Sequence, residues 1–256
     1  MKDLFDLKDK VALITGASSG MGKAIAEAMG THGAKVIVSS NDTEGGEQTV
    51  IDFKNRNMDA VFIPCDMSKK TDIKQLYDTS VEKYGKIDIL ASCVGLAQPN
   101  LFLDITASDF EKTMAINLQS AIYLTQLVIP SMRERKEGSI IYLASIAGVR
   151  GNKMIGLYGM SKAGLIQLTR NLAVEFGSDN IRVNSISPGM IDTPFSQGLM
   201  SDEEFMKKRL SLTPLRRVGS VSEIAGVAVM LASKAGGFIT GQNIIVDGGT
   251  TISDGN

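Results

Sequence analysis

The sequence predicts an α/β fold in which helices cover both faces of one doubly wound parallel sheet of about seven strands. Three observations lead to this prediction. Strand-like and helix-like segments alternate along nearly the whole chain, as in parallel sheets joined by helical crossovers. The strand-like segments are unbroken apolar runs, which indicates burial on both faces. The first of them leads directly into a glycine-rich turn and a helix.

Short apolar runs bounded by polar or glycine residues are expected to be the strands. They are rich in Val, Ile, Leu and Ala and are too short for independent helices. The expected strands are residues 11–15, 35–39, 60–64, 87–91, 139–144, 181–187 and 243–246.

Longer segments carry apolar residues at helical spacing. In the segment 157–176, for example, Leu157, Leu165 and Leu168 recur along the helix, and Gly177 ends it. The expected helices are residues 23–31, 44–57, 72–84, 107–135, 157–176 and 221–232, with a shorter one at 202–208.

The composition excludes several classes of protein. The chain has 256 residues, 43% apolar and 21% charged, with a net charge of −1 and no basic blocks, so neither nucleic acid nor a membrane is expected as a partner. No apolar run is long enough to span a bilayer and no signal peptide precedes the first strand, so we expect a cytoplasmic protein. The two cysteines, Cys65 and Cys93, lack metal-ligand spacing and His32 is the only histidine, so we expect no metal centre.

The glycine-rich turn has two possible functions. Gly16 to Gly22 (GASSGMG) lies between a strand and a helix, where glycines let the backbone approach a pyrophosphate and the helix N-terminus attracts its charge. The alternative is a plain tight turn. Gly16 to Gly20 also matches the nucleophile elbow of serine hydrolases, but His32 would lie roughly 18 Å away along the following helix at 1.5 Å per residue. We therefore favour phosphate binding.

Polar residues that follow strands should gather at one edge of the sheet. Gly16, Ser145 and Pro188 each come after an expected strand, as does the segment 92–95. In open parallel sheets, ligands bind at the carboxyl ends of the strands, where the strand order reverses. The sequence therefore predicts a ligand site at this edge.

Tyr158 and Lys162 form a candidate acid–base pair. They lie four residues apart in the first turns of the helix at 157–176 and so share a face, while Ser145 ends the preceding strand. A nearby ammonium favours the phenolate and lowers the phenol pKa, so Tyr158 could act as a general acid or base near neutral pH. The alternative is an ordinary amphipathic pair on a helix surface.

These motifs together resemble the short-chain dehydrogenase/reductase (SDR) family. The resemblance covers essentially the whole chain, and the motifs have the order and separations of that family. They are Thr15 to Gly22 (TGASSGMG), Asp66, Asn117, Ser145, Tyr158-x-x-x-Lys162, Pro188 to Thr193 (PGMIDT), Thr240-Gly241-Gln242 and Asp247-Gly248-Gly249.

The resemblance implies a Rossmann-type NAD(P)-binding domain over residues 1–256 and a nicotinamide-dependent oxidoreductase activity. Tyr158 would transfer a proton to or from substrate oxygen, Lys162 would lower its pKa and hold the nicotinamide ribose, and Ser145 would orient the substrate. Asn117 would support a water relay. Ile191 and Thr193 would meet the nicotinamide carboxamide, and Asp66 would lie beside the adenine or cap the following helix. The implied cofactor-binding set is Gly16, Ser18, Ser19, Gly20, Met21, Gly22, Ser40, Asn41, Asp66, Met67, Gly95, Tyr158, Lys162, Pro188, Gly189, Ile191 and Thr193.

One segment departs from the family pattern. The family usually has Asn-Asn-Ala-Gly after the fourth strand, whereas this chain has Ser92, Cys93, Val94 and Gly95. The backbone can still contact the adenosine ribose, so we expect binding to be retained and question only the local stability of the strand end.

The loop after the second strand favours NAD(H) over NADP(H). It contains Ser40 and Asn41, where relatives carry the aspartate of NAD-type or the arginine of NADP-type members, and Ser19 in the phosphate loop is also uncharged. Asp42 and Glu44 follow, and there is no Lys or Arg from Val36 through Phe53. An added 2′-phosphate would be poorly compensated there, although backbone N–H groups or Lys23 leave NADP(H) possible.

The substrate is expected to be a small ketone or secondary alcohol with an apolar body. Residues 190–215 are expected to form a lid, and Arg150 is either an acid-binding residue or an exposed loop residue. A 3-oxoacyl thioester reductase is the alternative enzyme, and a nucleotide-binding regulatory protein is the alternative outside catalysis. The candidate pocket residues are Ser145, Leu96, Ile146, Met154, Leu157, Met190, Phe195, Leu199 and Met200.

We also expect a homo-oligomer, most simply a tetramer. The helices at 107–135 and 157–176 carry more apolar positions than one sheet face should cover, and closed symmetric assemblies are common.

Overall fold

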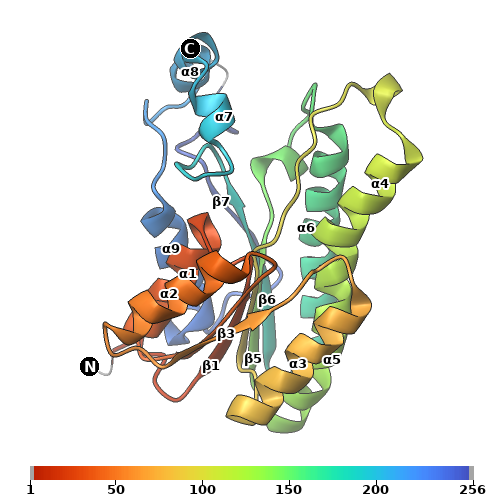
Figure 1. The fold of residues 1–256 in the computed structure, drawn as a ribbon. Coiled ribbons are helices and arrows are strands. Elements are labelled where there is room, and N and C mark those ends of the chain that lie inside the picture. Colours follow the sequence, from red (N-terminus) through yellow and green to blue (C-terminus); the bar gives the residue numbers. More distant parts are fainter. Residues whose placement is uncertain (1–2, 254–256) are drawn as a thin grey trace.

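The computed structural model describes residues 3–253 and contains the predicted parallel sheet with helices on both faces (Figure 1). The strands pair in the order β3-β2-β1-β4-β5-β6-β7. Because β1 lies between β2 and β4, the winding of the chain reverses there, and the carboxyl ends of β1 and β4 form the ligand crevice of such folds. The strands are β1 (Val11–Thr15), β2 (Lys35–Ser40), β3 (Ala60–Pro64), β4 (Ile89–Ser92), β5 (Gly138–Leu143), β6 (Ile181–Pro188) and β7 (Asn243–Val246).

Two apolar cores lie on the two faces of the sheet. In β1, Ile14 belongs to one core and Leu13 to the other, because successive side chains of a strand point to opposite faces. The first core is covered by α1 (Gly20–Thr31), α2 (Thr43–Lys54) and α9 (Val221–Ala232). The second is covered by α3 (Lys70–Tyr84), α5 (Ser120–Arg135) and α6 (Gly156–Phe176).

Local sequence signals set several helix ends. The Asp42 carboxylate accepts a hydrogen bond from the Gly45 N–H at 3.1 Å and so caps α2. Thr106 and Asp109 form a capping box at the start of α4 (Ala107–Met114). Gly85 ends α3 in the left-handed conformation, with φ 76°. Short 3-10 helices cover Phe102–Asp104, Ile146–Gly148, Gly177–Asp179 and Lys234–Gly236.

The expected helix at 107–135 is not uniform. A π-helical turn over Ala115–Gln119 separates α4 from α5, and the Ser120 N–H donates to the Ala115 carbonyl five residues earlier. The apolar periodicity persists across this turn, so the sequence pattern did not reveal it. Asn117 lies inside the turn, and such π-bulges are frequent at functional sites.

The segment between β6 and α9 carries two further helices. α7 (Gln197–Met200) and α8 (Glu203–Ser211) lie beyond the carboxyl end of the sheet (Figure 1), and α8 confirms the helix expected at 202–208. Within residues 3–253, no helix is long and apolar enough to cross a bilayer, and no group of three or more His, Cys, Asp or Glu side chains could hold a metal ion.

The glycine loop after β1 generates a stability prediction. A Cβ atom on Gly22 would stand 2.1 Å from the Gly16 carbonyl oxygen, whereas one on Gly226, exposed in α9, would meet nothing within 4 Å. We expect Gly22→Ala to lower the free energy of unfolding by about 1–3 kcal/mol. Gly226→Ala should raise it by about 0.5–1 kcal/mol, because alanine is the better helix former. Urea unfolding measures both, and equal stability of the two variants would contradict the packing of the loop.

Candidate active site

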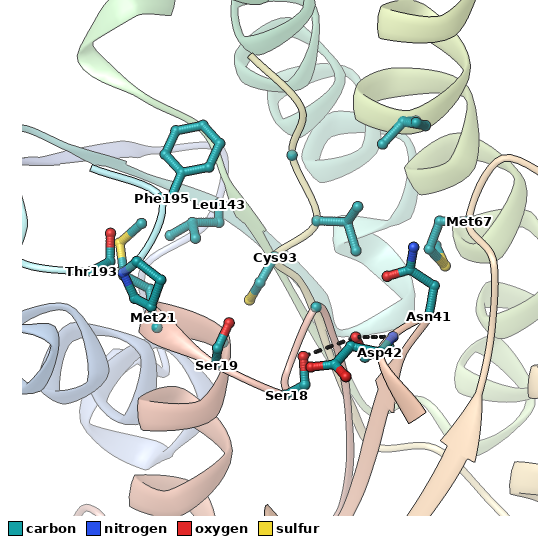
Figure 2. A pocket seen from close by; sticks show the side chains of 18 of the residues that line it. Ser18, Ser19, Met21, Asn41, Asp42, Met67, Cys93, Leu143, Thr193 and Phe195 are labelled. Atoms are coloured by element: carbon teal, nitrogen blue, oxygen red, sulfur yellow. Dashed lines mark hydrogen bonds between the residues drawn. The ribbon is translucent and has the colours of Figure 1, made fainter. Parts of the chain in front are cut away.

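A groove of about 390 Å³ runs along the carboxyl ends of the strands at the switch point. Figure 2 shows Met21 and Thr193 on one side, Asn41 and Met67 on the other, and Cys93 between them. Of the expected cofactor residues, Pro188, Gly189 and Ile191 do not line the groove. The others do: Gly16, Ser18, Ser19, Gly20, Met21, Gly22, Ser40, Asn41, Asp66, Met67, Gly95, Tyr158, Lys162 and Thr193.

The start of the groove fits a pyrophosphate. Gly16 has φ +66° and lies against Val94, so a side chain there would be strained and crowded. No side chain caps the N-terminus of α1, and its first turn has no acidic residue. The first-turn N–H groups and the positive end of the helix dipole are therefore available to an anion.

The groove wall formed by β2 and its loop is uncharged apart from Asp42. The Ser18 and Ser40 hydroxyls are 2.9 Å apart, and the Asp42 N–H donates to the Ser40 hydroxyl at 3.1 Å (Figure 2). The Lys23 ammonium is paired with Asp52 at 3.2 Å. Among the described residues that line the groove, Lys162 is the only cation.

Lys162 is the most deeply buried charged side chain of the groove, with 2% exposure. Its ammonium donates to the Leu143 carbonyl at 2.7 Å and to the Val94 carbonyl at 3.4 Å. A Cβ atom on Gly95 would stand 3.2 Å from this ammonium, so Gly95 leaves it room. Burial lowers the pKa of Lys162 to about 8, because an apolar environment disfavours the charged form.

Tyr158 differs from the sequence-based expectation. We expected Lys162 to lower its pKa, but burial raises the pKa of Tyr158, and only a hydrogen bond with Ser145 acts in the opposite direction. The physical reason is the position of Lys162, whose ammonium lies 5.6 Å from the centre of the Tyr158 ring and bonds to main-chain carbonyls. The Ser145 hydroxyl also accepts from the Ala147 N–H at 3.1 Å, which orients it at the end of β5.

Asn117 connects three segments of the site. Its side-chain amide donates to the Leu96 carbonyl and to the Ser161 hydroxyl, each at 2.9 Å. Its carbonyl oxygen accepts from the Leu96 N–H at 2.7 Å. The side chain thus joins the loop after β4 to α6 between Tyr158 and Lys162, a contact that the sequence pattern did not reveal.

A main-chain hydrogen bond stabilises the segment 92–95, which departs from the family pattern. The Cys93 N–H donates to the Thr15 hydroxyl at 3.2 Å, which ties the end of β4 to that of β1. Burial raises the pKa of the Cys93 thiol to about 12, so the thiol is neutral. Cys93 and Val94 line the groove, as expected for the segment 92–95. Leu143 and Ala144 also line it although sequence reasoning had not selected them; their place at the end of a strand was the available signal.

The structure differs from the sequence analysis in the role of Asp66 and in the positions of the candidate substrate residues. Asp66 does not cap α3, whose N-cap is Lys69. Its carboxylate instead accepts hydrogen bonds from the N–H and hydroxyl of Ser68 at 3.0 and 2.7 Å, which lowers its pKa.

The candidate substrate residues do not share one cavity. Only Phe195 lines the groove; Met154 and Leu199 are exposed, and Ile146 and Leu157 are buried. Leu96 and Met190 are half-buried, as are Met200 and Arg150.

A groove at the switch point of a parallel sheet, with a glycine-rich loop, a serine, a tyrosine and a lysine beside it, is typical of nicotinamide-dependent oxidoreductases. Comparison with known proteins supports this class of protein. The family model described as enoyl-(acyl carrier protein) reductase matches residues 16–251. A tropinone reductase homolog of Arabidopsis thaliana is 38% identical over 253 residues, which are 98% of this chain and 93% of that protein. The chain therefore belongs to the short-chain dehydrogenase/reductase family, whose members bind NAD(H) or NADP(H).

Solved structures of similar proteins include both cofactor types. A 7α-hydroxysteroid dehydrogenase in complex with NADH and 7-oxo glycochenodeoxycholic acid is 36% identical, with a TM-score of 0.93 and 97% of each chain covered. A putative 2-deoxy-D-gluconate 3-dehydrogenase from Agrobacterium tumefaciens with bound NADP is 28% identical, with a TM-score of 0.92 and coverage of 98% of this chain and 100% of that one.

The buried ammonium generates a prediction for stability. The pKa of Lys162 falls from 10.5 to about 8 on folding, so above pH 8 the unfolded chain binds more protons than the folded one and stability rises with pH. Lys162→Met lacks this titration. We therefore expect wild type to gain up to about 2 kcal/mol relative to the variant between pH 8 and about pH 10.

Urea unfolding at several pH values measures this difference. Lys208→Met, which removes an exposed ammonium from α8, is the matched control and should follow wild type. A constant difference between wild type and Lys162→Met across the range would show that the ammonium is not held in a destabilising environment.

Proposed function

We propose that this protein interconverts a secondary alcohol and a ketone by hydride transfer with a nicotinamide cofactor. The observation that carries the proposal is the placement of Tyr158 and Lys162 in the wall of the groove, with the Ser145 hydroxyl close enough to lower the pKa of Tyr158. The names of the similar tropinone reductase homolog and 7α-hydroxysteroid dehydrogenase support a ketone or alcohol on an apolar ring as substrate.

The groove residues Gly16 to Gly22, Tyr158 and Lys162 would hold a nicotinamide cofactor, which would supply the hydride for reduction of a carbonyl carbon. Ser145 donates a hydrogen bond to the substrate oxygen and fixes its position. Tyr158 gives its hydroxyl proton to that oxygen as negative charge develops on it, so that an alcohol forms. Because burial raises the pKa of Tyr158, the hydroxyl is protonated at neutral pH and gives up its proton only as the substrate oxygen becomes basic.

Lys162 and Asn117 support this transfer. Lys162 lies in the wall of the same groove, where its ammonium would hold the nicotinamide ribose. Asn117 is a positioning residue, since its side chain is bonded to Leu96 and Ser161 rather than to Lys162. A water relay to Lys162 would therefore use its main chain.

A second candidate function is reduction of the ketone of a 3-oxoacyl thioester. The description of the matching family model, enoyl-(acyl carrier protein) reductase, supports a thioester-bound acyl chain as the substrate. A panel of ketones, alcohols and 3-oxoacyl thioesters, followed by the absorbance of the reduced nicotinamide, separates the two. A regulatory nucleotide-binding protein would bind the cofactor but turn over no member of the panel.

Tyr158→Phe tests the proton donor. The phenyl ring occupies the same space, so the fold should persist, while loss of general acid catalysis should lower kcat by at least about 10²–10⁴-fold. The control is Tyr84→Phe, which removes a hydroxyl bonded to Asp59 on the far side of the molecule and should leave kcat unchanged. Turnover near wild type in Tyr158→Phe would refute the assignment.

We further propose that the protein prefers NAD(H). The end of β2 and the loop after it offer the neutral Ser40 and Asn41, and the Lys23 ammonium is paired with Asp52. A ribose hydroxyl needs only neutral partners, whereas a 2′-phosphate there would meet Asp42 without compensation.

Asn41→Arg tests this preference. The added guanidinium should shift the ratio of kcat/KM towards NADP(H) by about tenfold or more, equivalent to about 1.4 kcal/mol. Asn55→Arg adds the same charge at the exposed C-terminal end of α2 and should leave the ratio unchanged. A wild-type preference for NADP(H) of tenfold would overturn the charge argument.

The lid and the assembly complete the proposal. Residues 190–215 would close over the substrate, since Phe195 and Leu199 are 58% and 52% exposed and the Phe195 ring lies 6.3 Å from that of Tyr158.

We propose a tetramer that uses the groove between α5 and α6, where Ile129, Leu168 and Leu172 lie.

Sedimentation at micromolar concentration tests the assembly. We expect four times the chain mass, and a smaller species for Leu172→Glu, which would place a charge in the apolar groove between α5 and α6. A monomer mass for wild type would refute the proposal.

A further inference from the structure

The Ser196 hydroxyl is the centre of a hydrogen-bond cluster between β6 and α7. Its oxygen lies 2.6 Å from the Ile191 carbonyl oxygen, 3.1 Å from the Thr193 hydroxyl oxygen and 3.2 Å from the Thr193 main-chain nitrogen. Ser196 and Thr193 are 7% and 5% exposed, so water competes little for these bonds. The cluster therefore fixes the shape of the turn that leads from the sheet edge into α7.

Thr193 is the member of this cluster that lines the groove. A Cβ atom on Gly20, in the glycine loop, would stand 3.5 Å from the Thr193 Cβ atom, and the Phe195 ring lies 6.3 Å from that of Tyr158. Figure 2 shows Thr193 and Phe195 on the side of the groove opposite Asn41. Thr193 thus lies between the expected pyrophosphate position and the expected proton donor. A nicotinamide ring belongs there, because the hydride and the proton must reach the same carbonyl group.

The hydroxyl protons of the cluster can be assigned, because each hydroxyl has only one. The Ser196 proton goes to the Ile191 carbonyl, its nearest acceptor at 2.6 Å. The other acceptors are the Thr193 carbonyl at 3.0 Å, which already accepts from the Ser196 N–H, and the Met200 sulfur at 3.6 Å. Ser196 can then only accept from the Thr193 hydroxyl. The Thr193 hydroxyl therefore gives its proton to Ser196 and has lone pairs left for a donor in the groove.

We propose that Ser196 is a positioning residue that makes the Thr193 hydroxyl an acceptor for the NH₂ group of the nicotinamide carboxamide. This inference rests on the proposed hydride transfer with a nicotinamide cofactor. A carboxamide carries an NH₂ donor on one side and a carbonyl acceptor on the other, and rotation exchanges them. An acceptor at Thr193 selects the rotamer whose NH₂ group points to it. A single carboxamide rotamer favours a single placement of the ring for hydride transfer.

Equilibrium binding tests this inference without turnover. The acetylpyridine analogue of the nicotinamide dinucleotide that wild type prefers carries a methyl group in place of the carboxamide NH₂, so it cannot donate to Thr193. Isothermal titration calorimetry gives the ratio of Kd for the analogue to Kd for the parent cofactor. We expect a ratio of about three to ten in wild type, equivalent to one hydrogen bond. In Ser196→Ala the Thr193 hydroxyl is free to donate to the acetyl carbonyl, so the ratio should fall towards one.

Two controls separate loss of the acceptor from general effects. The thionicotinamide analogue keeps the NH₂ group, so its Kd relative to the parent cofactor should be the same in wild type and in Ser196→Ala. Ser201→Ala makes the same change at the end of α7, where it removes an exposed hydroxyl bonded to the Gly198 carbonyl at 3.0 Å. That variant should keep the wild-type ratio for the acetylpyridine analogue.

A double-mutant cycle excludes a merely structural role. Thr193→Val removes the acceptor itself and should lower the ratio as far as Ser196→Ala does. Ser196→Ala added to Thr193→Val should then change the ratio no further, because Ser196 acts through Thr193. If Ser196→Ala does not fold, Ser196→Cys, which keeps a side chain of similar size with a weakly hydrogen-bonding thiol, takes its place in the cycle.

The outcomes distinguish this inference from the proposed function. An unchanged ratio in the Ser196 variant, a further fall in the double variant, or a ratio of one in wild type would each overturn the role of Ser196. Reduction of ketones in the substrate panel would leave the proposed function standing in all three cases. If the panel shows no turnover but the ratios change as expected, ketone reduction is wrong and the role of Ser196 in cofactor binding stands.

Discussion

The position of the candidate active site depends on one buried ammonium. Isolated charges are very unfavourable in a protein interior, so the Lys162 ammonium must find oxygen acceptors. It finds them in the carbonyls of Leu143, the last residue of β5, and of Val94, two residues after β4. The bond sets the distance of α6 from the sheet edge, and thereby places Tyr158, one turn earlier, beside Ser145. Gly95 is part of the same constraint, since a side chain there would crowd the ammonium.

Asn117 fixes the opposite side of this arrangement. The π-helical turn shifts the phase of the α4–α5 helix by one residue, and Asn117 lies within that turn. Its amide then satisfies both main-chain groups of Leu96 and the Ser161 hydroxyl, so the loop after β4 cannot move without breaking hydrogen bonds that are largely shielded from water. Lys162 and Asn117 thus hold α6 to the sheet edge from two directions. Such a doubly held helix is a suitable platform for a proton donor whose position must be accurate.

The sequence was sufficient for features that depend on local pattern. Strand bounds such as Val11–Thr15 and Ala60–Pro64 were predicted because unbroken apolar runs define buried strands, and the gathering of Gly16, Ser145 and Pro188 at one edge follows from parallel strands. It was insufficient where tertiary contacts decide. The π-helical turn leaves the apolar periodicity intact, the raised pKa of Tyr158 depends on burial and on where Lys162 points, and the unpartnered Nε of Arg209 depends on how α8 packs. The individual roles of Asn117 and Asp66 came from family resemblance, which names a residue without showing its bonds.

The distribution of charge relates the two ends of the site. The wall formed by β2 and its loop is neutral except for Asp42, and the centre holds one cation of weakened basicity. A cofactor with a neutral ribose suits the first region, and a carbonyl that gains negative charge during reduction suits the second. Charge complementarity in these two regions would set the orientation of cofactor and substrate before hydride transfer begins.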